Sequence, residues 1–233
     1  MAESSEHFPF RYRLIFSSRR RTLGIRIKQS DVTVSAPTGC SMTLINRFIA
    51  EKQFWIQKHL QHAAQTTAVN WLERGQLPLL DEQLMLVQQR GTRSAVQRDE
   101  QQLYVTVSGR VKPEHQSRKV QQLLHDWYRQ YAGHWFGQRV AFWAPLMQVK
   151  PAAIKTGQWK TKWGYCNHKA ELGFNWRLLM APAWVADYVV VHELAHIRHM
   201  NHSPAFWQLV HQFYSQADEA RKWLKHHQHQ LEI

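Results

Sequence analysis

The feature that most constrains this chain is the run His192-Glu193-Leu194-Ala195-His196, which directly follows the apolar segment 188–191. The apolar residues on its N-terminal side predict a buried helix that carries the motif. Two imidazoles and a carboxylate are costly to bury unless each finds a partner. The fold must therefore bring a partner to these three groups, and a metal ion would serve all of them.

The spacing of the motif predicts a zinc site with a neighbouring base. On a helix, His192 and His196 lie on one face with β-carbons about 5 to 6 Å apart, so both imidazoles can bind one Zn2+. Glu193 is rotated by roughly 100° from His192, which suits proton transfer from a zinc-activated water better than metal binding. Chance would produce only about 0.05 such motifs in a chain with 15 histidines. We therefore predict a zinc-dependent hydrolase with Glu193 as general base.

A catalytic zinc usually has three protein ligands, so a third ligand is required. His199 would lie about 10 Å along the axis from the first histidine, which is too far to share the ion. Asn201 is suited to end the motif helix in a left-handed conformation, and Ser203-Pro204 resemble the cap and first residue of a new helix. The resulting turn would return His202 to the metal. We favour His202 as the third ligand and keep Glu219, from a later helix, as the alternative.

The first half of the chain is predicted to be β-rich with one helix. Ser41 is a candidate cap for a helix whose apolar residues, from Leu44 to Ile56, follow three-and-four spacing. We expect residues 1–110 to form this N-terminal region, with its first three strands arranged as a meander. Alternating or β-branched runs predict the strands, at residues 10–14, 23–27, 32–34, 84–87 and 103–107.

The second half, residues 111–233, is predicted to be a helical core that completes an α+β fold. Pro113 suits a first helical turn, and an apolar stripe from Val120 to Trp135 predicts a long amphipathic helix that ends near Pro145. A hairpin should follow, and the motif helix should begin near Pro182. The expected hairpin strands are residues 154–163 and 171–174, which flank a polar turn at 167–169.

Composition adds expectations about partners and compartment. The 30 Lys plus Arg exceed the 17 Asp plus Glu, and the net charge of +13 favours anionic partners such as nucleic acid, nucleotides, acidic proteins or lipid headgroups. Cys40 and Cys166 cannot form a disulfide framework. Glu3 and Glu6 argue against a secretory signal, and no apolar stretch is long enough to span a bilayer. We expect a soluble, cytoplasmic protein without a membrane partner, and the sequence does not indicate its oligomeric state.

Several further segments carry a recognisable pattern: Lys162-Trp163-Gly164-Tyr165-Cys166, Leu172-Gly173-Phe174-Asn175-Trp176-Arg177-Leu178, the extended motif from Tyr188 to His196, and Asn201-His202-Ser203-Pro204-Ala205-Phe206-Trp207. Together they resemble the YgjP-like metallopeptidase family, which is similar in its zinc core to the SprT and WLM proteases. Residues 20–23, 34–37 and 54–56 also resemble this family, so the likeness covers almost the whole chain.

The resemblance implies zinc on His192, His196 and His202, a catalytic Glu193, and a β-rich N-terminal part joined to a minimal zincin-like core. The chain departs from the family pattern near the hairpin. Tyr165 stands where the family usually has a small serine, and Lys162 stands where arginine is commoner. The resemblance therefore does not imply that this chain shares the family's substrate contacts near the hairpin.

Three functions remain open from the sequence. The first is a peptidase in which a hairpin strand pairs with an extended peptide, and the SprT and WLM likeness suggests nucleic-acid-bound proteins as substrates by analogy. The second is a phosphoanhydride hydrolase acting on nucleotides with the same zinc and Glu193. The third is a basic nucleic-acid-binding module with a structural zinc, against which the lack of an obvious fourth protein ligand argues. The residue that would stabilise an oxyanion is not evident.

Overall fold

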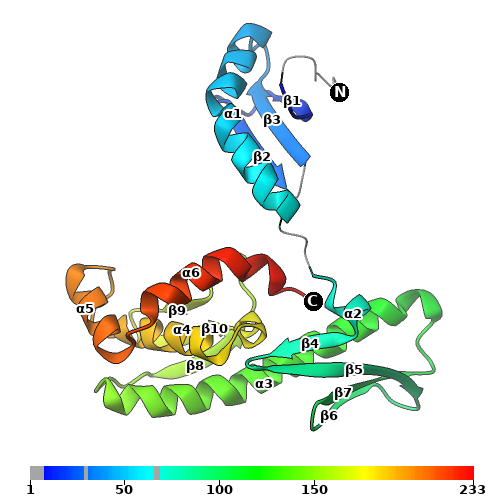
Figure 1. Cartoon of the computed structure of the whole chain (residues 1–233), viewed down its shortest axis with the longest axis vertical. Helices are drawn as coiled ribbons and strands as arrows, with labels where there is room; N and C mark the ends of the chain where they lie inside the picture. Colours follow the sequence, from blue (N-terminus) through cyan, green and yellow to red (C-terminus); the bar gives the residue numbers. More distant parts are fainter. Residues whose placement is uncertain (1–7, 29–30, 66–68) are drawn as a thin grey trace. The chain divides into compact units, whose positions relative to one another are not determined.

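The computed structural model describes residues 8–28, 31–65 and 69–233, and the chain divides into two compact units, Met1–Ala68 and Val69–Ile233 (Figure 1). We expected the division at residue 110, where the β-rich region ends. It lies earlier because the strands between residues 76 and 108 share one hydrophobic core with the helices that follow them. Glu3 and Glu6 lie outside the described residues. No helix in the described part of the chain is long and apolar enough to cross a membrane.

The first unit is a three-stranded sheet with one helix on it. Its strand order is β1-β3-β2, in which β3 pairs in parallel with β1 and antiparallel with β2. The expected meander is therefore wrong. The strand with the most regular buried alternation, through Val32, Val34 and Ala36, takes the centre and packs its apolar side chains on both neighbours. The elements are β1 (Tyr12–Ser17), β2 (Gly24–Lys28), β3 (Asp31–Pro37) and α1 (Met42–Gln65).

Helix α1 begins where its capping residue predicts. The Ser41 hydroxyl oxygen accepts a hydrogen bond from the backbone N–H of Leu44 at 3.4 Å. Ile45, Ile49 and Ile56 are fully buried in the core of this unit, so the three-and-four spacing is confirmed. The buried stripe is narrower than expected, because Leu44 remains 53% exposed.

The other face of this sheet is basic. Arg13 on β1 and Arg26 on β2 are both exposed and lie opposite Thr33 of the central strand, so the two arginines flank it in one row. The Arg20 guanidinium lies over Gly24, where a β-carbon would come within 2.7 Å of it. Within the described residues, no carboxylate forms an ion pair with these three arginines. This surface therefore attracts anions.

The second unit is organised around one long helix, α3, which contacts both of its sheets (Figure 1). One sheet has the order β4-β5-β7-β6 and the other β8-β10-β9. The elements are α2 (Trp71–Arg74), β4 (Gln76–Leu79), β5 (Glu82–Gly91), β6 (Ala95–Asp99), β7 (Gln102–Ser108), η1 (Pro113–His115), α3 (Gln116–Leu146), β8 (Ala153–Gly157), β9 (Gly164–Cys166), β10 (Glu171–Asn175), η2 (Trp176–Met180), α4 (Ala183–Ala195), α5 (Pro204–Phe213), α6 (Ala217–His227) and η3 (Gln228–Gln230).

Helix α3 buries one straight stripe of side chains. The stripe recurs every four residues, and its flanking aromatic residues Trp127, Tyr131 and Trp135 are half-buried beside it. The helix ends one residue after Pro145, as predicted. The stripe joins the sheets and α4 into one core, and its members are Val120, Leu124, Tyr128, Ala132, Phe136, Val140 and Ala144.

The predicted hairpin exists but is shorter than expected. Only β9 pairs antiparallel with β10, while β8 lies on the other edge of β10 and runs parallel to it. The segment between β8 and β9 lies outside the sheet, and the Asn175 side-chain amide holds it by donating to the carbonyl oxygens of Trp159 and Lys162, at 3.0 and 3.2 Å. The strand order β8-β10-β9 makes β9 an edge strand.

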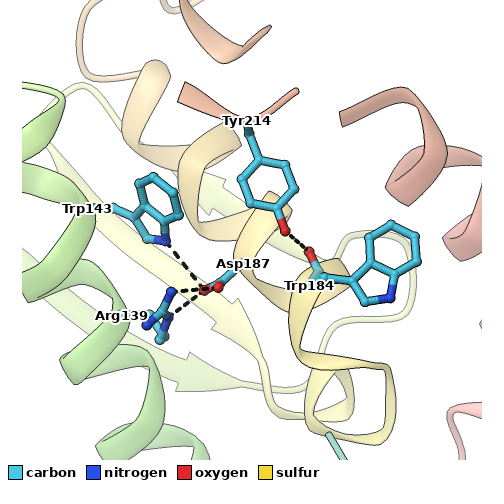
Figure 2. Close-up of polar contacts among 5 residues, drawn as sticks. All are labelled: Arg139, Trp143, Trp184, Asp187 and Tyr214. Carbon is cyan, nitrogen blue, oxygen red and sulfur yellow. Dashed lines mark hydrogen bonds and ion pairs between the residues drawn. The ribbon is translucent and has the colours of Figure 1, made fainter. Parts of the chain in front are cut away.

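Polar contacts fix α4, the helix of the motif, to its neighbours (Figure 2). The Asp187 carboxylate accepts two hydrogen bonds of 2.6 Å from the Arg139 guanidinium on α3, and one of 3.4 Å from the Trp143 indole N–H. Tyr214, at the end of α5, donates its hydroxyl to the backbone carbonyl of Trp184. Helix α4 is thus held on two sides, by contacts five and eight residues before the first motif histidine.

Candidate metal centre

Three histidines converge at the end of α4. His192 lies in its last turn, His196 caps it, and His202 lies just before α5. One potential ligand nitrogen from each ring lies within 4.8 Å of the others, and the Nε2 atoms of His192 and His202 are 3.1 Å apart. Tetrahedral zinc with bonds of 2.0 to 2.1 Å would separate its ligand atoms by about 3.3 Å. The spacing of His192 and His202 therefore suits one such ion, and the nitrogen of His196 lies within 4.8 Å of both.

The turn that returns His202 differs in one respect from the expected turn. Asn201 does not adopt a left-handed conformation. Helix α4 ends instead in tight turns, in which the N–H groups of Ile197 and Arg198 each donate 3.1 Å hydrogen bonds to carbonyls three residues back. Helix α5 begins as predicted at Ser203-Pro204, where the serine hydroxyl accepts from the backbone N–H three residues later at 3.4 Å.

Hydrogen bonds on the far side of two rings orient their Nε2 atoms. His196 Nδ1 lies 3.0 Å from the carbonyl oxygen of His199, so this nitrogen carries the proton and donates it. His192 Nδ1 lies 3.3 Å from the Tyr188 hydroxyl, one helical turn earlier. The carbonyl contact leaves the Nε2 lone pair of His196 for a metal, and the same holds for His192 when its Nδ1 donates to the Tyr188 hydroxyl.

The environment favours neutral imidazoles, which are the forms that bind metal. Burial, together with the neighbouring His196, His202 and Arg221, lowers the pKa of His192 to about 3. Burial also lowers the pKa of His196. The Phe206 ring packs against all three imidazoles, with centroid distances between 4.5 and 4.9 Å. Three imidazole nitrogen donors packed against one aromatic ring fit a zinc ion.

Glu193 is buried beside this cluster. Its side chain lies directly against Gly164 of β9, where a β-carbon would come within 2.6 Å of the carboxylate Oε1 atom. Burial raises the pKa of Glu193 to about 8, and the charge of Lys162 opposes this shift. The carboxylate therefore has a raised affinity for a proton and a position fixed by the edge strand.

The cluster opens into a cavity of about 430 Å³. His192 and Glu193 form part of its wall, so a molecule in the cavity would contact both the candidate ligand and the candidate base. The remaining wall comes from the start of β9, from α4, and from α6 with the residue after it, through Trp163, Gly164, Tyr188, Val189, Arg221, Leu224, Lys225 and Gln228.

The structure brings His192, His196 and His202 together and leaves Glu219 outside. Glu219 is exposed on α6, and among the described residues the group able to hold a metal does not include it. Sequence reasoning missed the contacts of Tyr188 and the close approach of Gly164. The four-residue spacing between Tyr188 and His192 was a usable signal, because both lie on one helix face. Nothing in the sequence locates Gly164 against Glu193.

Comparisons with known proteins identify the family of the chain. The YgjP-like family, described as a YgjP-like metallopeptidase domain, matches residues 21–227, which include all four candidate residues. The crystal structure of the metallopeptidase zymogen of Pyrococcus abyssi abylysin is similar at 17% identity over 41% of this chain and 97% of that chain, and its TM-score of 0.37 is too low to establish a shared fold. No curated protein sequence matches the chain significantly. The chain belongs to the YgjP-like metallopeptidase family, a family of metal-dependent hydrolases.

Proposed function

We propose that this protein is a zinc-dependent peptidase in which His192, His196 and His202 hold the metal and Glu193 is the general base. The observation that carries the proposal is the convergence of three imidazoles beside one buried carboxylate. Three ligands would leave a fourth position for water or substrate. That composition favours catalysis over a purely structural zinc.

The residues around the site have defined parts in this proposal. When bound, zinc supplies a Lewis acid that polarises a carbonyl group and makes water more acidic. Glu193 accepts the proton from water and returns it to the leaving amine. Its pKa of about 8 describes the site without metal, and positive charge nearby would lower that value towards neutrality. Tyr188 and the His199 carbonyl act indirectly, by orienting the ligand rings.

The position of β9 supports a peptide as substrate. Within the described strands, β9 pairs with β10 on one edge only. An extended peptide can add to such an edge through backbone hydrogen bonds. Gly164 of this strand touches Glu193, so a peptide bound along β9 would run past the proposed base.

Two other functions remain to be separated by experiment. A nucleotide hydrolase could use the same zinc and Glu193, and a nucleic-acid-binding module could use the metal only for structure. Metal-loaded protein should therefore be incubated with a mixed peptide library, with protein bound to DNA, and with nucleoside triphosphates. Cleavage of peptide bonds is the expected result, and hydrolysis of triphosphates without any peptide cleavage would replace the proposal.

The roles of the residues are tested by comparing zinc content with turnover. Protein purified without a histidine tag should contain about one zinc per chain. Glu193→Gln should retain that zinc and lose roughly a hundredfold or more in kcat, because glutamine cannot accept the proton. Undiminished turnover in Glu193→Gln would leave the mechanism without its base. Turnover by fully metal-free protein would remove the role of zinc.

A further inference from the structure

One face of α6 and the residue that follows it forms a wall of the cavity beside the metal centre. Arg221, Leu224, Lys225 and Gln228 are spaced by three, four and seven residues, so they project from the same side. None of the functions predicted from the sequence involves the residues of this face. It places two cationic side chains at the cavity that contains His192 and Glu193.

The lining of the cavity is partly apolar and partly cationic. Trp163, Val189 and Leu224 supply the apolar surface. The one carboxylate among its lining residues is Glu193, which is assigned to proton transfer. A positively charged substrate group would thus meet Arg221 and Lys225 without a free carboxylate to bind, whereas a negatively charged group would meet two cations.

Contacts outside the cavity hold the Arg221 guanidinium in position. It stacks over the Trp207 ring at 4.4 Å, and that ring stacks in turn on His202, with centroids 5.7 Å apart. One of its nitrogens lies 3.2 Å from Asp218, in an exposed pair on the same helix. A guanidinium has five N–H donors, so this pair leaves others for a carboxylate.

A second cavity continues the basic lining. It has a volume of about 340 Å³, shares Trp163 and Gln228 with the first, and is also lined by Lys160 and Lys162. Arg177 and Glu232 lie there as an ion pair of 3.1 Å, so their charges offset each other. No ion pair to Lys160 or Lys162 is found within the described residues, and these two lysines extend the preference for anionic groups away from the metal.

We propose that the cavity beside the metal is the specificity pocket of the peptidase and accepts a peptide carboxylate next to the scissile bond. Arg221 and Lys225 bind that carboxylate, and the apolar lining residues contact the carbon chain that carries it. The carboxylate belongs either to an Asp or Glu side chain or to the free C-terminus of the peptide. This inference rests on the proposed peptidase function.

The test uses peptides that differ only in charge next to the cleaved bond. Zinc-loaded full-length protein is given matched peptides with Glu, Gln or Lys on either side of that bond. A second pair is neutral and has a free or an amidated C-terminus, which separates the two sources of carboxylate. We expect kcat/KM to be at least about tenfold higher for the Glu peptide than for the Gln peptide, or for the free than for the amidated C-terminus.

A charge reversal in the pocket provides the matched comparison. Lys225→Glu should reduce the preference for the carboxylate to about one or reverse it, and Lys225→Arg should retain it. Lys222→Glu is the control, because Lys222 is exposed on the same helix, carries the same charge and does not line the cavity. Zinc content and thermal midpoint of each variant establish that it is folded. An equal loss of preference in Lys222→Glu would overturn the pocket in favour of general attraction by the basic surface.

Binding gives a readout that does not need turnover. The Glu193→Gln protein should bind the Glu peptide at least about tenfold more tightly than the Gln peptide in calorimetry. Equal binding and equal cleavage of the two peptides would refute the pocket and leave the peptidase function intact. If the wild-type protein cleaves no peptide and hydrolyses triphosphates, with that activity lost in Lys225→Glu, both the function and the pocket assignment are replaced.

Discussion

The contact between Gly164 and Glu193 predicts that one methyl group on β9 will displace the base without removing the metal. In Gly164→Ala, the new β-carbon would lie 2.6 Å from Oε1 and 2.8 Å from Cγ of Glu193. Ordinary contact begins at 3.4 Å, so the carboxylate or the strand must move by about 0.8 Å. Gly164 does not have a left-handed backbone, so alanine introduces no strain of that kind.

A displacement of this size should reduce kcat by about a hundredfold, because proton transfer depends steeply on geometry. The three atoms nearest to the new methyl group all belong to Glu193, so zinc content should remain at the wild-type level. The assay measures peptide turnover and bound zinc on the same samples. Gly137→Ala is the control, because a β-carbon at Gly137 in α3 would meet no atom within 4 Å. It should keep wild-type turnover and gain about 0.5 to 1 kcal/mol in stability.

A double variant identifies the route of the effect. If Gly164→Ala acts by moving Glu193, it should cause almost no further loss in the Glu193→Gln background, since the base is already absent. A hundredfold additional loss in that background would show that the methyl group acts elsewhere, for example on peptide binding at β9. Wild-type kcat in Gly164→Ala alone would refute the assigned position of the base.

Four further predictions concern metal binding, stability and charge. His202→Ala should lose bound zinc while Glu219→Ala retains it, and the opposite result in elemental analysis would transfer the third ligand to Glu219. Asp187→Ala should lower the free energy of unfolding by about 2 kcal/mol in a denaturant titration, because it leaves the partly buried Arg139 guanidinium without its carboxylate. An unchanged denaturation midpoint would contradict this prediction. In metal-free protein, the free energy of unfolding should fall as pH rises from about 4.5 to about 8, because the raised pKa of Glu193 means that folding favours its neutral form. Glu193→Gln should remove the part of this decrease that Glu193 causes. We also propose that the basic face of the first sheet binds polyanions. Arg13→Gln combined with Arg26→Gln should lower the slope of log binding constant against log salt concentration for DNA by about two, whereas Arg47→Gln, which removes an arginine already paired with Glu51, should change that slope less. A DNA binding constant that does not change with salt would count against this surface.

Local rules predicted the part of the site that lies within a few turns of chain. His192 and His196 follow from helical spacing, and Ser203 begins α5 through its side-chain cap. The left-handed ending at Asn201 was wrong, because α4 closes its free carbonyls with tight turns instead. Several local devices can end a helix, and residue type alone does not choose among them.

Long-range pairing was the part that sequence patterns could not predict. Alternation in residues 32–36 identified the buried face of β3, but it does not say which strand is central, so the meander was wrong. The boundary at residue 110 followed a change from strands to helices, whereas the cores divide at Ala68. Gly164 and Lys225 reach the site through tertiary packing across many residues. No periodicity in the sequence encodes those contacts.

The short segment between α4 and α5 has two tasks that depend on its length. The His199 carbonyl fixes the ring of His196, and three residues later His202 supplies a nitrogen to the same cluster. An insertion or deletion between them would disturb the orientation of one ligand and the reach of another together. Among relatives that bind metal in this way, the residue types at 197, 198 and 200 should therefore vary more than the length of the segment. An alignment gap there would mark chains that have lost the metal centre even where both motif histidines remain.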